Sequence, residues 1–190
     1  MKKLLFTVAA VSALAVAGAA PAQGSLKTAV FAGGCFWSAE KAMESLPGVK
    51  DAVSGYAGGA SKNPTYQNHS GHLEVVRVTY DPARVSYAKL VDHFFHNIDP
   101  TDPNGQICDQ GPSYRTAIFV ASPEERKIAQ EVAAQVAKAI RQPVATAIRP
   151  AATFYKAEAY HQDYAKKNPG QYNRYRIGCG RDRALKAVWG

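Results

Sequence analysis

Residues 28–49, TAVFAGGCFWSAEKAMESLPGV, place a short apolar run, two glycines, a cysteine and an amphipathic run in direct succession. Thr28–Ala32 predicts a buried strand, and Gly33-Gly34 predicts a tight turn, because glycine adopts positive φ angles and lets other groups approach closely. A helix is predicted next, since apolar residues recur at helical spacing at Phe36, Ala39, Met43 and Leu46. The segment therefore predicts that Cys35 stands at a helix N-terminus.

The position of Cys35 favours a reactive thiol. Unpaired N–H groups and the macrodipole at a helix N-terminus favour negative charge, so we expect the thiolate to be stabilised there. An inert core cysteine is the alternative, because free cysteine is among the most buried residue types. A core cysteine would need neither the Gly-Gly turn before it nor the aromatic pair Phe36-Trp37 after it. The other helix face is polar and comprises Ser38, Glu40, Lys41, Glu44 and Ser45.

Residues 1–22 predict a secretory signal peptide. Lys2-Lys3 gives a positive start, Leu4–Ala17 is an apolar or small-residue run, and small residues with Pro21 follow. The run is short for a membrane span, and cleavage is expected after Ala19 or Ala22. An uncleaved anchor is the alternative. We therefore expect a periplasmic or secreted protein with one domain over residues 26–190.

Charge and cysteine content narrow the function classes. The chain has 190 residues and a formal net charge of +8, which falls to +6 without Lys2 and Lys3. This charge favours acidic partners but is weak evidence for nucleic acid, and the basic cluster near the C-terminus is expected to be solvated. Three cysteines in an exported protein leave at least one free or transiently paired, which favours redox chemistry over a disulfide scaffold.

The order of predicted elements is β-α-β-β-α-β-α-β. It predicts an α+β fold, a two-layer sandwich of helices on a mixed, mainly antiparallel sheet with a ferredoxin-like core. Residues 169–190 are expected to form an irregular, mobile tail. The further strands are predicted over 49–56, 72–80, 115–121 and 144–149, the further helices over 86–97, 122–140 and 157–168, and two long loops over 57–71 and 99–113.

Glu74 lies in the second predicted strand after the helix, on the same face as His72, Val76 and Val78. Burial without a cationic partner would raise the pKa of this carboxyl and make it a general acid. A carboxylate exposed at a sheet edge, or paired with Arg77, is the alternative that spacing alone favours. The two long loops flank this strand, and long loops are often functional.

Several ordered motifs together resemble one known family. The chain is similar to the A-type peptide methionine sulfoxide reductases, whose hallmark is Gly-Cys-Phe-Trp. The resemblance runs from about Thr28 to Asn168, and the Cys-Gly-Arg-Asp…Val-Trp-Gly ending is similar to one subgroup. The motifs that carry it are Gly33–Trp37, Pro64–Tyr66, Gly71–Val76, Tyr80–Pro82, Asp109–Gly111, Ser113–Ile118, Phe154–Glu158 and Tyr160–Gln162.

The resemblance implies a role for each site residue. Cys35 would attack the sulfur of methionine-S-sulfoxide, and Glu74 would give a proton to the leaving oxygen. Tyr66 and Tyr114 would hydrogen-bond that oxygen. Phe36 and Trp37 would form the apolar pocket for the S-methyl group, and Asp109 would orient the site.

The resemblance also implies the rest of the cycle. Cys35 would become a sulfenic acid, a second thiol would condense with it to a disulfide, and a thioredoxin-like dithiol reductant would reduce that disulfide. No metal or organic cofactor would be needed, and the substrates would be oxidised proteins or peptides. Cys179 matches the family's C-terminal resolving position, whereas Cys108, beside Asp109, could resolve instead or relay the disulfide onward.

Two other function classes compete with this prediction. A cysteine hydrolase would use Cys35 with His72 or His161 as its base and would form an acyl-enzyme. A basic, exported binding module would use its tyrosines to contact a polymer. The histidine pairs His69/His72 and His93/His96 have metal-ligand spacing but no carboxylate or thiol beside them, so we expect no metal site.

Overall fold

The computed structural model describes residues 25–190, and the signal peptide predicted over 1–22 lies outside these residues. The main sheet has the strand order β7-β6-β1-β3-β2-β8, and a second, two-stranded sheet pairs β4 with β5. All neighbours in the main sheet are antiparallel except β6 and β7. The strands are β1 (Lys27–Ala32), β2 (Val49–Ala57), β3 (Leu73–Tyr80), β4 (Gly105–Gln106), β5 (Asp109–Gln110), β6 (Ala117–Val120), β7 (Ala147–Pro150) and β8 (Tyr155–Lys156).

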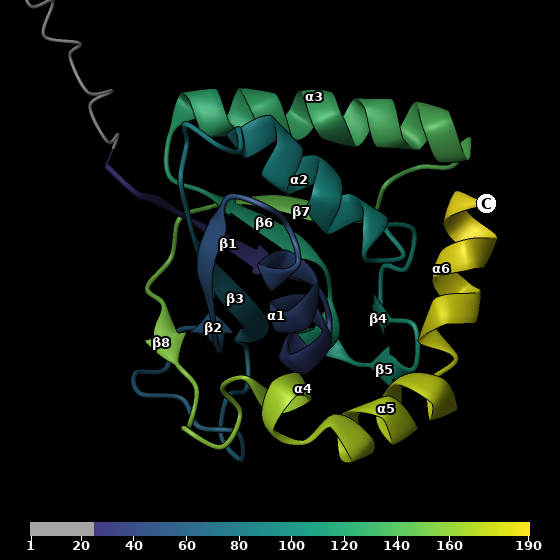
Figure 1. Cartoon of the computed structure of the whole chain (residues 1–190). Helices are drawn as coiled ribbons and strands as arrows, with labels where there is room; N and C mark the ends of the chain where they lie inside the picture. Colours follow the sequence, from purple (N-terminus) through teal and green to yellow (C-terminus); the bar gives the residue numbers. More distant parts are fainter. Residues whose placement is uncertain (1–24) are drawn as a thin grey trace, which may run out of the picture.

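The predicted α+β fold is confirmed. Strands β6-β1-β3-β2 place β3 between β1 and β2, which is the split βαβ arrangement of a ferredoxin-like core. The first three helices pack their apolar faces on one side of this sheet, as Figure 1 shows. The helices are α1 (Phe36–Glu44), α2 (Tyr87–His96), α3 (Pro123–Ile140), α4 (Tyr164–Lys167), α5 (Pro169–Gly178) and α6 (Arg181–Trp189), with a 3-10 turn η1 (Pro112–Tyr114).

Helices α2 and α3 begin where the sequence predicts. The Ser86 hydroxyl accepts a hydrogen bond from the Lys89 N–H at 3.2 Å, and the Ser122 hydroxyl accepts one from the Glu125 N–H at 3.1 Å. These caps satisfy N–H groups that have no partner within the helix. Each helix then buries an apolar face in the large core, which also receives Phe31 of β1 and Met43 of α1.

The expected irregular tail was wrong, because residues 169–190 form helices α5 and α6. Figure 1 shows these helices running past the β4–β5 hairpin. They are held to the body by side chains: Tyr172 is fully buried, the Arg181 guanidinium donates to the Asn97 carbonyl at 2.7 Å, and Nε1 of the partly buried Trp189 donates to the Ile98 carbonyl at 3.1 Å. These partners lie more than 80 residues away in sequence, so local composition did not reveal them.

The prediction of a helix over 157–168 was also wrong for most of these residues, since only Tyr164–Lys167 is helical. Glu158 accepts hydrogen bonds from the Tyr56 hydroxyl and the Tyr66 N–H, and Gln162 bonds the backbone of Ser54. These bonds to other elements hold the segment in turns. Asp163 then adopts a φ of +55°, which is incompatible with a continuous α-helix.

Among residues 25–190, every helix is too short or too polar to cross a lipid bilayer.

Candidate active site

The Gly-Gly turn places Cys35 at the N-terminal end of α1. Gly34 has a φ of +78°, and a Cβ atom there would lie 2.5 Å from Cβ of Gln106, so only glycine fits. Cys35 is the N-cap of α1, and its carbonyl accepts hydrogen bonds from the N–H groups of Ser38 and Ala39. Its thiol is free and only 7% of the residue is exposed.

Glu74 lies beside this helix end and is 1% exposed, so the edge-strand alternative was wrong. The N–H of Phe36 donates to Glu74 Oε2 at 3.0 Å. Burial raises the pKa of Glu74 to about 8; the charge of Asp109 adds to the rise and the Phe36 hydrogen bond opposes it. The carboxyl is therefore mostly protonated at neutral pH and can donate a proton.

The expected stabilisation of the Cys35 thiolate is not found in this structure. Burial raises the pKa of Cys35 to about 12, the charges of Glu74 and Asp109 add to the rise, and bonds from the Tyr175 hydroxyl and the Trp37 backbone oppose it. The first amide of α1, that of Phe36, bonds to Glu74 rather than to the thiol. Desolvation thus outweighs the helix N-terminus, and Cys35 and Glu74 both hold their protons at neutral pH.

One cavity of about 190 Å³ brings the predicted residues together. The lining includes a thiol, a carboxyl, the aromatic pair and phenol groups, so the cavity combines apolar surface with proton donors. Burial raises the pKa of both Tyr66 and Tyr114, which keeps their hydroxyls protonated as hydrogen-bond donors. Its lining residues are Cys35, Phe36, Trp37, Tyr66, Glu74, Asp109, Tyr114 and Tyr175.

The aromatic wall is fixed from behind by residues 158–164. The Trp37 indole stacks on Tyr164 with ring centroids 3.7 Å apart, and its Nε1 donates to His161 Nδ1 at 3.0 Å. Glu158 accepts from the Tyr66 N–H at 2.8 Å and so holds the backbone of the loop that carries Tyr66. These contacts restrict the Trp37 ring and the loop that carries Tyr66 before any ligand enters.

Tyr175 is the lining residue that the sequence did not identify. It lies on α5, donates its hydroxyl proton to Asp109 Oδ2, and lines the same cavity as the Cys35 thiol. Tyr172 on the same helix is fully buried and packs into the body of the protein instead. The sequence signal was an aromatic pair close to Cys179. Because the C-terminal tail was expected to be mobile, no contact between Tyr175 and the cavity was predicted.

Cys108 and Cys179 form a disulfide with Cα atoms 5.2 Å apart. The sequence left open whether Cys108 resolves in place of Cys179 or relays the disulfide onward, and a bond between these two cysteines is the pairing that a relay would form. Cys108 is exposed and lies in the β4–β5 turn, directly before the cavity residue Asp109. In the described part of the chain, Cys108, Asp109 and Cys179 form the one cluster with metal-ligand spacing, but disulfide sulfurs are not thiolate ligands.

The two histidines considered as hydrolase bases, His72 and His161, both form hydrogen bonds with groups other than the Cys35 thiol. His72 Nδ1 accepts from the Gly59 N–H at 3.2 Å, and His161 Nδ1 accepts from Trp37. Neither imidazole lines the cavity that holds Cys35. A buried thiol beside a protonated carboxyl, with no imidazole base in the lining, defines a thiol-dependent oxidoreductase rather than a cysteine hydrolase.

Comparison with known proteins identifies the family. The model of the family described as peptide methionine sulfoxide reductase matches residues 27–190, and the chain belongs to this family of enzymes. Peptide methionine sulfoxide reductase MsrA 2 of Caulobacter vibrioides is 52% identical over 198 residues, covering 100% of both chains.

Solved structures agree with the sequence comparison. Mxr1 from Saccharomyces cerevisiae in reduced form is 32% identical with a TM-score of 0.72, and the match covers 80% of this chain and 89% of that chain. Mxr1 in complex with Trx2 is 25% identical with a TM-score of 0.54, over 79% of this chain and 91% of that chain. The resemblance seen in the motifs is therefore confirmed over the whole described fold.

Proposed function

We propose that this enzyme reduces methionine-S-sulfoxide in exported proteins, with Cys35 as nucleophile and Glu74 as acid. The observation that carries the proposal is the shared cavity: a thiol and a protonated carboxyl lie against the aromatic pair Phe36 and Trp37. An S-methyl group is apolar and a sulfoxide oxygen is a strong acceptor. The aromatic wall suits the first, and Glu74 with the phenols of Tyr66 and Tyr114 suits the second.

In the first step, the sulfur of Cys35 attacks the sulfoxide sulfur. Glu74 gives its proton to the sulfoxide oxygen, and the thiol proton of Cys35 passes to Glu74 in exchange. The resulting hydroxyl moves to the Cys35 sulfur as the S–O bond of the sulfoxide breaks, and the bond between the two sulfurs breaks to release methionine. The products are methionine, reduced by two electrons, and the sulfenic acid of Cys35, oxidised by two. No net proton enters or leaves, so the reactive form of the site is the one in which both groups are protonated.

In the second step, the Cys179 thiol attacks the Cys35 sulfenic acid, and a disulfide forms with loss of water. The Cys108 thiol then attacks Cys179, which frees Cys35 and forms the Cys108–Cys179 disulfide. The bond between these two cysteines and the free Cys35 fit the state at the end of this sequence. A dithiol reductant would next attack at exposed Cys108, and the complex of Mxr1 with Trx2 supports a thioredoxin-like protein in that role.

Discrimination between sulfoxide epimers tests the function directly. With the methyl group against Phe36 and Trp37, only one configuration at sulfur directs its oxygen to Glu74, and we expect this to be the S epimer. Dithiothreitol-driven turnover of a peptide containing methionine-S-sulfoxide should exceed that of the R-epimer peptide by about 100-fold or more, since lost transition-state contacts of this kind cost several kcal/mol. Equal rates on both epimers, or turnover of neither, would contradict the proposal.

The transfer of the disulfide from Cys35–Cys179 to Cys108–Cys179, here called the relay, predicts how many equivalents of sulfoxide one enzyme molecule converts without reductant. Enzyme that is fully reduced and freed of reductant should convert two equivalents of sulfoxide, because the Cys108–Cys179 disulfide releases Cys35 for a second reaction. Cys108→Ser and Cys179→Ser should each convert one equivalent, and both should turn over poorly with thioredoxin. Quenched-flow counting of methionine per enzyme measures this. One equivalent from the wild type, or two from Cys108→Ser, would reject the relay.

Export is proposed from residues 1–22 alone, whose charged start, apolar run and small residues are typical of a signal peptide. Mass measurement of the protein recovered from the periplasm should give an N-terminus after Ala19 or Ala22, and an intact Met1 would refute it.

A further inference from the structure

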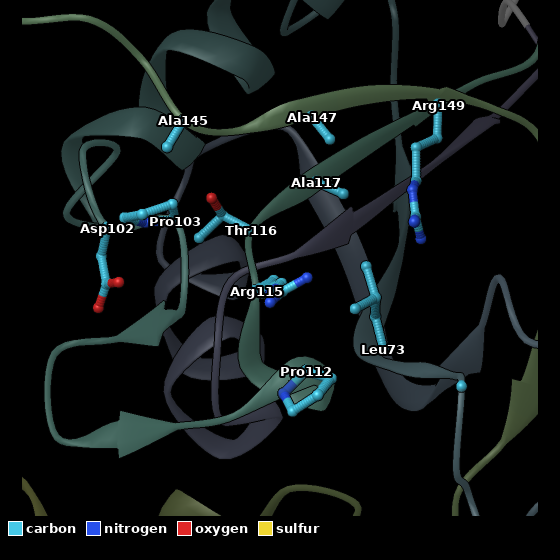
Figure 2. A pocket seen from close by; sticks show the side chains of 11 residues that line it. Leu73, Asp102, Pro103, Pro112, Arg115, Thr116, Ala117, Ala145, Ala147 and Arg149 are labelled. Atoms are coloured by element: carbon cyan, nitrogen blue, oxygen red, sulfur yellow. The ribbon is translucent and has the colours of Figure 1, made fainter.

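A second and larger cavity lies on the sheet face away from the core helices. Its volume is about 310 Å³, and Figure 2 shows it beside β6 and β7. The space exists because small side chains stand where larger ones would fill it: Ala117 on β6 and Ala147 on β7 are paired in register, and Ala145 lies next to them. Leu73 supplies the apolar side of this cavity.

Two unpaired arginines border the same cavity. Figure 2 shows the side chains of Arg115 and Arg149 on either side of Leu73. Across residues 25–190, no carboxylate forms a salt bridge with either guanidinium. The third charged residue is Asp102, whose carboxylate accepts hydrogen bonds from the N–H groups of Asn104 and Gly105 and from the Gln110 amide. The cavity therefore offers two free cations beside an apolar surface.

This arginine pocket adjoins the active cavity through two shared chain segments. Leu73 and Glu74 are consecutive on β3, so their side chains point to opposite faces of the sheet, one into each cavity. Tyr114 and Arg115 are likewise consecutive, and Pro112 at the start of η1 lines the arginine pocket. A peptide whose methionine sulfoxide occupies the active cavity would have to pass around η1 to reach the arginines.

We propose that the arginine pocket binds an acidic side chain of the peptide substrate, close in sequence to the methionine sulfoxide. The proposal rests on the function proposed above and specifies its substrate class. A guanidinium pairs with a carboxylate in a planar, two-point geometry, and Leu73, Ala117 and Ala147 accept the aliphatic part of a glutamate side chain. The concave shape suits an inserted side chain better than the flat face of a partner protein, and consecutive residues of the chain line this pocket and the active cavity.

Matched peptides test this proposal. Each peptide in the set carries a single glutamate, placed at one position between four residues before and four residues after the methionine sulfoxide. Each is compared with the same peptide carrying glutamine at that position. For wild type at low salt, we expect kcat/KM at the favoured position to be about 5-fold higher for glutamate, because Arg115 and Arg149 are exposed and exposed ion pairs contribute modestly. The double variant Arg115→Gln/Arg149→Gln should lose this ratio, and Ala147→Leu should reduce it by filling the pocket without changing the charge.

The control variant is Lys50→Gln/Arg84→Gln, which removes the same charge from exposed positions near the opposite end of β3. It should keep the glutamate preference. N-acetyl-methionine sulfoxide reports the chemistry alone, so its turnover separates failure of the arginine pocket from failure of the proposed function. A wild-type ratio near one, or a ratio that survives in the arginine double variant, overturns the proposal. So does a double variant whose only defect is a raised KM for thioredoxin, because the pocket would then serve the reductant.

Discussion

Replacing Cys35 by serine is expected to abolish sulfoxide reduction, both with dithiothreitol and in a single turnover without reductant. The serine hydroxyl cannot take the oxygen and become a sulfenic acid, so the first step has no alternative route through this residue. Neither Cys108 nor Cys179 lines the cavity, so neither thiol can replace Cys35 at the substrate sulfur. The measurement is methionine formed per enzyme after rapid mixing, with a probe that reacts selectively with sulfenic acids as a second readout.

The matched control is Cys108→Ser/Cys179→Ser, which retains Cys35 alone. We expect one equivalent of methionine from this variant and a stable, trappable sulfenic acid. Cys35→Ser should give neither signal while keeping the wild-type circular dichroism spectrum, because Cys35 makes no side-chain cap hydrogen bond that supports α1. Methionine formation by a folded Cys35→Ser protein would assign the nucleophile to another residue.

The local signals around Cys35 predicted the centre of the fold correctly. The apolar run 28–32 became β1, the two glycines became the turn, and the spacing of Phe36, Ala39 and Met43 became the buried face of α1. Such features depend on interactions between near neighbours in sequence. The polar side of α1 was less well predicted, since Ser38 and Glu40 are each 2% exposed. Ser38 is buried by the C-terminal region, as the contact of its hydroxyl with the Tyr172 hydroxyl at 3.3 Å indicates.

The C-terminal helices were not predictable by the same means. Their sequence lacks a continuous apolar stripe, and single residues hold them: Tyr172, Arg181 and Trp189 each reach partners far along the chain. The missed role of Tyr175 has the same cause, because its position in the cavity depends on the docking of α5. The seven cavity residues named from the motifs were found together, since the resemblance carries information on long-range contacts that periodicity lacks.

The Cys35 pKa illustrates a conflict between two physical effects. A helix N-terminus lowers a thiol pKa when its amides face the sulfur, and burial raises it. Here burial is the larger effect, and the nearest amide bonds to Glu74. The same burial raises the pKa of Glu74, so one apolar environment both suppresses the resting thiolate and prepares the acid. The sequence predicted the position of the thiol but not the balance between the two effects.

Replacing Glu74 by glutamine is expected to lower the single-turnover rate by about 100- to 1,000-fold, the usual contribution of general acid catalysis. Glutamine keeps the size of the side chain, and its carbonyl oxygen can still accept from the Phe36 N–H, but it has no acidic proton to give. The wild-type rate should be highest below pH 8 and should fall as the pH rises through about 8, where Glu74 loses its proton. The glutamine variant should lack this decline.

Glu40→Gln is the matched control, because Glu40 is also a buried carboxyl with a raised pKa, about 7, but lies outside the cavity lining. Its rate and its decline near pH 8 should match those of the wild type. If Glu74→Gln stays within about 3-fold of the wild-type rate, the lost acid was not required, since general acid catalysis contributes far more than that. If the decline near pH 8 persists in Glu74→Gln, another group gives the proton. The protonated carboxyl beside the thiol separates this mechanism from simple thiol exchange, because only a sulfoxide oxygen must be protonated before it can leave the methionine sulfur.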